Sequence, residues 1–245
     1  MIKADFLIVG TMKSGTSTLS SILNQHPKVN IPKNELHFFN RDINYNKGEN
    51  FYNKNFITGF LNGEKTPTYS YQPNCAERIY KYNSKIKLIW ILRNPVDRAI
   101  SNYYHAFKNG KENKSLIDCF MLEEKRVKQN IFKGYFVRSL YSKQVERFLK
   151  YFPKSQMYFA IFEEMIHNYD EEINKINNFL HIDKFSFELE HKNKTKQNIF
   201  RKIYDLIINN KKIKNKIKID LKFYYNEEIN ILEKLINKDL KIWRN

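Results

Sequence analysis

Unbroken apolar runs mark the candidate strands of this chain. Residues Phe6–Gly10, Lys87–Leu92 and Gln156–Phe162 are almost continuously apolar, which is typical of strands buried on both faces of a parallel sheet. Val29–Ile31 is a shorter extended piece. Segments with apolar residues three or four positions apart lie between these runs and indicate helices. The pattern predicts an α/β protein.

The periodic segments give the helices that we expect. They are Thr16–Gln25, Glu49–Phe60, Pro73–Tyr82, Val96–Phe107, Ser115–Gln129, Val137–Tyr151, Tyr169–Leu180, Phe200–Asn210 and Phe223–Ile236. Gly63–Tyr69 is predicted to be a turn, and Lys212–Lys222 alternates Ile with Lys, which leaves strand and helix open. All seven Gly lie at or before Gly134, so the final third of the chain is predicted to be mainly helical.

Length and composition suit one domain over residues 1–245. The chain is 42% hydrophobic and 15% aromatic, enough for a sizeable core. No apolar run is long enough to cross a bilayer. The first apolar segment is also too short for a signal peptide, so we expect a cytoplasmic protein. Only Cys75 and Cys119 are present, without metal-ligand spacing, and we expect neither a disulfide framework nor a metal.

The net charge of +17 is concentrated late in the chain. His191–Lys222 holds ten Lys and one Arg against two Asp, about half of the excess. A Lys-rich coding bias would spread the charge, whereas this clustering favours a surface for anionic partners. The basic segments lack interleaved aromatics and any nucleic-acid-binding motif, so nucleic acid is not an expected partner. Contact with a membrane surface stays open.

The strongest chemical signal is Phe6–Leu19, where a buried strand enters a turn of small residues and then a helix. Backbone N–H groups and the positive end of the helix dipole favour an anion there. Lys13 adds a charge, and Ser14, Thr16 and Ser17 add hydroxyl donors. Walker A loops place Lys after the second Gly, whereas Lys13 precedes Gly15. The stretch predicts a phosphate cradle of another pattern, with a plain strand–turn–helix corner as the alternative.

Three further positions carry candidate chemistry. Glu35 and His37 share a face if their stretch is extended, and burial could tune such a pair for proton transfer. The plainer interpretation is a surface Glu and a partly buried His. Lys65 lies in a turn-forming segment next to Pro67, where it is either a fixed cation or a solvated loop lysine.

Arg93 and Ser101 predict a second phosphate site. Arg93 ends an apolar strand, and ligands of open parallel sheets bind at the carboxyl ends of strands. Arg also suits bidentate contact with a phosphate. Ser101 follows one to two turns into the next predicted helix.

Taken in order, these residues resemble the PAPS-dependent sulfotransferases, in particular the heparan-sulfate glucosaminyl 3-O- and N-sulfotransferase branch. PAPS is 3′-phosphoadenosine 5′-phosphosulfate, and PAP is its product. Four stretches carry the resemblance: Phe6–Leu19, Lys33–Phe39, Glu64–Pro67 and Leu88–Tyr104. Weaker similarity continues through Arg138–Tyr141 and Asn193–Lys196.

The resemblance implies a fold, a reaction and site residues. The fold is a P-loop-type central parallel sheet flanked by helices. The reaction moves the sulfuryl group of PAPS in line to a hydroxyl or amine of a carbohydrate-type or other small acceptor, and no metal is required. The implied roles are Glu35 as general base, Lys65 and His37 flanking the reacting groups, Lys13, Ser14, Gly15, Thr16 and Ser17 on the 5′-phosphosulfate, and Arg93 and Ser101 on the 3′-phosphate.

Three departures limit what is carried over. One residue separates Lys33 from Glu35 where the family has them adjacent, and Asn40 stands where the 3-O-sulfotransferases carry an acid. The family's late Cys-flanked, Gly-containing loop has no counterpart. Acceptor identity, its acidity and the residues over the adenine therefore stay open. The alternative functions are an ATP-dependent small-molecule kinase and a non-catalytic protein that binds anionic glycans.

Overall fold

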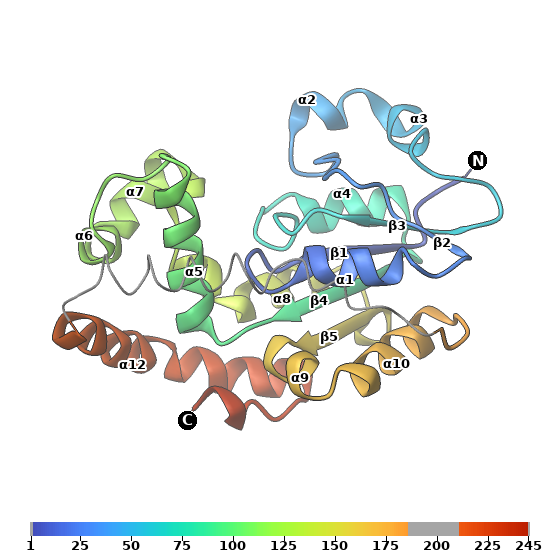
Figure 1. Cartoon of the computed structure of the whole chain (residues 1–245). Coiled ribbons are helices and arrows are strands. Elements are labelled where there is room, and N and C mark those ends of the chain that lie inside the picture. The colour runs from blue at the N-terminus through green and yellow to red at the C-terminus, as the bar shows by residue number, and fades with distance from the viewer. Residues whose placement is uncertain (1, 186–210, 245) are drawn as a thin grey trace.

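A central parallel sheet organises the molecule. The computed structural model describes residues 2–185 and 211–244. Its five strands pair in the order β2-β3-β1-β4-β5, and every pairing is parallel. The strands are β1 (Phe6–Gly10), β2 (Val29–Asn30), β3 (Leu61–Lys65), β4 (Lys87–Leu92) and β5 (Met157–Ile161). The predicted α/β class with a flanked parallel sheet is confirmed, and β1 lies in the middle (Figure 1).

Each face of the sheet is covered by its own layer of helices. Side chains alternate across a strand, so Phe6 and Ile8 enter one core while Leu7 and Val9 enter the other. The Phe6 face packs against α1 (Thr16–Leu23) and α10 (Tyr169–Leu180). The other face packs against α4 (Cys75–Tyr82), α5 (Pro95–Lys108), α8 (Tyr141–Leu149) and α12 (Lys211–Ile236).

The remaining helices are short and lie at the edges of these layers (Figure 1). In Figure 1, α6 and α7 group with α5, whereas α2 and α3 lie apart from them beside β3 and α4. The bounds are α2 (Asp42–Tyr45), α3 (Gly48–Asn53), α6 (Leu116–Met121), α7 (Glu123–Gln129) and α9 (Phe162–His167), with 3-10 turns at Ile131–Lys133, Val137–Ser139, Lys154–Gln156 and Lys241–Trp243. No helix in the described ranges is long and apolar enough to cross a membrane.

The segment predicted to be a turn at Gly63–Tyr69 is partly a strand. β3 pairs with β1, and Gly63 lies opposite Phe6. A Cβ at Gly63 would overlap the Phe6 ring, so glycine is needed here for close packing and not for a turn. Asn62 and Glu64 are buried with hydrogen-bond partners from other segments. A hydrophobic pattern cannot predict that these buried polar side chains find hydrogen-bond partners.

Two predicted helices differ in their bounds from the helices of the structure. The helix predicted at Ser115–Gln129 is split at Leu122 into α6 and α7. The one predicted from Val137 is a 3-10 turn at first and becomes α-helical at Tyr141. The open segment Lys212–Lys222 is helical, as part of α12. The helix predicted at Phe200–Asn210 lies outside the described residues.

Candidate active site

The loop between β1 and α1 presents the start of a helix. Ser14 and Thr11 share a hydrogen bond of 2.7 Å between their hydroxyls, and the Thr11 hydroxyl donates to the Ile91 carbonyl of β4. Gly15 has a left-handed φ of 88° and offers no side-chain cap to α1. The first backbone bond of the helix runs from Leu19 N–H to the Gly15 carbonyl. The N–H groups of the first turn therefore remain available to an anion.

Cations gather beside this loop. The Arg93 guanidinium donates to the Lys13 carbonyl at 3.1 Å and lies 4.8 Å from the Phe162 ring centre. The Arg93 Nε–H is buried and has no partner among the described residues. Burial lowers the pKa of Lys13, and the charges of Arg93 and Lys108 lower it further. Positive charge held this closely favours an anionic ligand.

A second group of predicted residues meets near the start of α1. Lys65, at the carboxyl end of β3, donates to Glu35 Oε1 at 3.1 Å and to the Ser17 hydroxyl at 3.4 Å. Glu35 Oε2 lies 3.5 Å from His37 Nε2. The Lys65 side chain is buried, whereas about a third of Glu35 is exposed. The structure therefore brings Glu35, His37 and Lys65 together and joins them to the phosphate loop.

The Glu35 segment is held by buried polar contacts. Glu64 Oε1 accepts hydrogen bonds from the Thr66 hydroxyl and from Leu36 N–H. The Thr66 hydroxyl oxygen in turn accepts from His37 N–H at 3.3 Å. Burial raises the pKa of Glu64 to about 7, against the lowering effect of these hydrogen bonds. Burial, followed by the charge of Arg41, lowers the pKa of His37. This lowering favours the uncharged imidazole.

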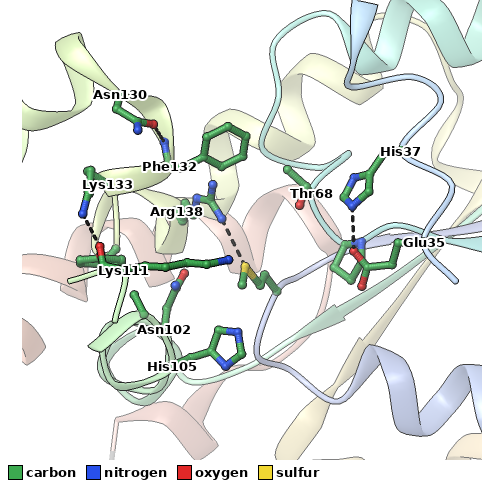
Figure 2. A pocket seen from close by; sticks show the side chains of 14 residues that line it. Glu35, His37, Thr68, Asn102, His105, Lys111, Asn130, Phe132, Lys133 and Arg138 are labelled. Atoms are coloured by element: carbon green, nitrogen blue, oxygen red, sulfur yellow. Dashed lines mark hydrogen bonds and ion pairs between the residues drawn. The ribbon is translucent and has the colours of Figure 1, made fainter. Parts of the chain in front are cut away.

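A pocket of about 640 Å³ opens beside Glu35 and His37. Figure 2 shows these two side chains on one side of it and Asn102, His105 and Lys111 on the other. The pocket is lined by Met12, Glu35, His37, Pro67, Thr68, Asn102, His105, Ala106, Lys111, Asn130, Phe132, Lys133, Tyr135 and Arg138. Glu35 is the single carboxylate in this lining.

Sequence reasoning missed the far wall of this pocket. Asn102 and His105 are three positions apart and so share a face of α5, a signal that the sequence offered just after Ser101. Lys133 and Tyr135 come from a segment with no regular period. Arg138 lies in a stretch of weaker family resemblance, which gave it no role beside Glu35.

The contacts of Ser14 and Ser101 do not match their predicted roles directly. The Ser14 hydroxyl bonds to Thr11 and so shapes the loop. Ser101 is half-buried within α5, and the hydrogen bonds of the described residues do not join it to Arg93. Their roles toward a phosphate stay predictions. In the described ranges, groups of three or more His, Cys, Asp or Glu that could hold a metal are absent.

Proteins of known structure share this fold. A crystal structure of a sulfotransferase from Alicyclobacillus acidocaldarius superposes with a TM-score of 0.81 at 28% identity, covering 100% of both chains. Mouse sulfotransferase SULT7A1 complexed with PAP gives 0.51 at 18% identity over 75% of this chain and 60% of that one, which shows the fold alone.

Sequence relatives point the same way. Human heparan sulfate glucosamine 3-O-sulfotransferase 5 is 37% identical over 184 residues, 72% of this chain and 53% of that protein. The chain thus spans about half the length of that relative. The membrane-associated sulfotransferase kil1 of Dictyostelium discoideum is 39% identical over 118 residues, 45% of this chain and 25% of that protein. The sulfotransferase domain family matches residues 3–229, and the chain belongs to that family.

Proposed function

We propose that this protein transfers the sulfuryl group of PAPS to a hydroxyl or amine of a carbohydrate-type acceptor. The observation that carries the proposal is the position of Glu35. Its carboxylate is fixed by Lys65 at the pocket edge, and Lys65 also reaches Ser17 at the start of α1. A proton acceptor, an acceptor pocket and an anion site thus adjoin one another.

The residues around the loop fit a nucleotide that is charged at both ends. The uncapped first turn of α1 and Lys13 suit the 5′-phosphosulfate. Arg93, with a buried and unpartnered Nε–H, suits the 3′-phosphate, with Ser101 as a second donor. The sulfotransferase family uses PAPS, and one protein with this fold was crystallised with PAP.

Each side chain then has a chemical task. PAPS, when bound, supplies a sulfuryl group activated by its bond to phosphate. Glu35 accepts the proton of the attacking hydroxyl or amine, while Lys65 fixes its other oxygen. Lys13 and the helix N–H groups stabilise the charge that develops on the departing phosphate oxygen. His37, whose lowered pKa favours the uncharged imidazole, flanks the acceptor.

The pocket supports an acceptor of carbohydrate size. Its volume falls in the range of small-molecule sites, and its wall mixes aromatic rings with hydrogen-bond donors. Several relatives are named for heparan sulfate glucosamine, which motivates testing a glycan first. Asn40 hydrogen-bonds with His37, beside the proposed base.

The test is Glu35→Gln, assayed by PAP release from PAPS with desulfated heparan sulfate as acceptor. Loss of a general base lowers turnover by about 10²–10⁴-fold. PAP binding should be unchanged, because the phosphate loop is intact. Glu49→Gln, which alters an exposed carboxylate paired with Lys3, is the matched control and should keep wild-type turnover. Full turnover by Glu35→Gln would show that the base assignment is wrong, and turnover of ATP in place of PAPS would favour a kinase.

A further inference from the structure

Trp243 lies beyond the residues that match the family, yet it is hydrogen-bonded to Asn94, the residue that follows Arg93. It belongs to the 3-10 turn after α12, and only 2% of it is exposed. Its indole N–H donates to Glu163 Oε2 at 2.8 Å. Its ring lies against Tyr141, with 6.2 Å between ring centres.

Glu163 connects Trp243 to the residue after Arg93. Its other oxygen, Oε1, accepts from the Asn94 backbone N–H at 2.9 Å. The Asn94 side chain donates back to the Trp243 carbonyl at 3.1 Å. These three hydrogen bonds close a ring through Asn94, Glu163 and Trp243. Asn94 also caps α5 by accepting from Val96 N–H at 3.0 Å, so the ring fixes the start of that helix.

Arg93 has contacts at both its carbonyl and its side chain. Its carbonyl accepts from the Tyr141 hydroxyl at 2.9 Å, and Tyr141 is the residue against which the Trp243 ring packs. Its side chain lies over Phe162, the residue before Glu163. The Trp243 turn therefore contacts the two side chains, Tyr141 and Glu163, that hold the Arg93 carbonyl and the Asn94 N–H.

We infer that Trp243 is a positioning residue for Arg93, which it aligns for contact with the 3′-phosphate of the nucleotide. The inference rests on the proposed function, in which Arg93 holds that phosphate. Charge-assisted contacts of a guanidinium are directional, so a small displacement of its backbone weakens them. Trp243 needs no contact with the nucleotide to have this effect.

The test compares the dissociation constants of PAP and 5′-AMP, measured by calorimetry. The two ligands differ by the 3′-phosphate, so their ratio reports on Arg93 and cancels general effects on the fold. Trp243→Phe keeps an aromatic ring against Tyr141 and removes the bond to Glu163. It should lower the preference for PAP by about three- to tenfold and leave 5′-AMP affinity unchanged. Glu163→Gln, which keeps the aromatic packing, should show the same loss.

Two further variants separate the possible outcomes. Arg93→Ala should abolish the preference for PAP, and an intact preference there would overturn the proposed role of Arg93 itself. Tyr82→Phe is the matched control: it removes buried hydrogen bonds with Ala4 and Asn53 at the amino end of β1 and should keep the preference. If Arg93→Ala loses the preference while Trp243→Phe and Glu163→Gln keep it, or weaken both ligands equally, the inference about Trp243 is wrong.

Discussion

Lys13 carries its positive charge in surroundings that oppose it. It is partly buried, and Arg93 and Lys108 are the charged groups that act on it most. In the part of the chain that the structure describes, no ion pair involving Lys13 offsets them. A bound phosphosulfate would supply the missing negative charge. We therefore propose that a bound anion compensates the charge of Lys13.

This environment gives a pH dependence to nucleotide binding. The pKa of Lys13 in the free protein is below its usual 10.5, and a bound anion raises it by favouring the charged form. PAP affinity should therefore be full below the free-protein pKa and decline as pH rises toward the pKa of the complex. Calorimetric titration with PAP between pH 7 and pH 10.5 measures this decline.

Substitutions at position 13 identify the titrating group. Lys13→Arg should bind PAP without the decline, because a guanidinium stays charged across this range. Lys13→Ala should lose most of the affinity at every pH. A wild-type affinity in the alanine variant would contradict the assignment of the phosphate loop.

At the scale of elements, the corner between β1 and α1 depends on Gly15. Its φ of 88° is left-handed, and a Cβ there would lie 3.0 Å from the Phe162 ring. The Arg93 guanidinium lies over the same Phe162 ring, so Gly15 and Arg93 share one neighbour. The phosphate loop and the end of β4 are thus coupled through α9, which follows β5.

Gly15→Ala should destabilise the protein and weaken PAP binding. The left-handed conformation costs an L-residue about 1–2 kcal/mol, and the crowded Phe162 ring adds to this. Gly59→Ala is a matched control, because Gly59 has a φ of 82° but nothing within 4 Å of a new Cβ. Denaturant unfolding should show a loss in both variants, whereas calorimetry should show weaker PAP binding only for Gly15→Ala. Equal PAP affinities in the two would mean that the corner does not shape the site.

Some elements were predictable from sequence because their stability is local or their burial is complete. β1, β4 and β5 are continuous apolar runs, and the helices after β1 and β4 follow from periodicity. β3 was missed because Asn62, Gly63 and Glu64 are stabilised by partners far along the chain. The contact of Glu163 with Trp243 spans 80 residues and leaves no local pattern for the same reason.

The candidate site divides in the same way. Glu35, His37 and Lys65 were predicted from side-chain chemistry and the family resemblance, and the structure places them in contact. The pocket wall formed by Asn130–Arg138 was not predicted, since its position depends on how α6 and α7 fold back beside α5. The sequence thus predicted Glu35, His37 and Lys65 better than the pocket residues of Asn130–Arg138.

At the scale of the whole molecule, we propose that the chain recognises an adenosine with phosphate at both its 3′ and 5′ positions. The net charge of +17 would favour many anions, so a charge effect alone must be separated from recognition. A kinase on a similar fold would prefer ATP, and a protein that only binds anionic glycans would show no preference for PAP over other nucleotides.

Thermal unfolding with PAP, 5′-AMP, ADP and ATP at equal concentrations separates recognition of PAP from a general charge effect. A ligand at about 100 times its dissociation constant stabilises the folded state by about 2.7 kcal/mol. For a chain of this size, PAP should raise the midpoint by roughly 5–10 °C. The other three nucleotides should raise it less. Stabilisation by ATP that equals or exceeds that by PAP, or no response to PAP, would show that the site does not recognise PAP.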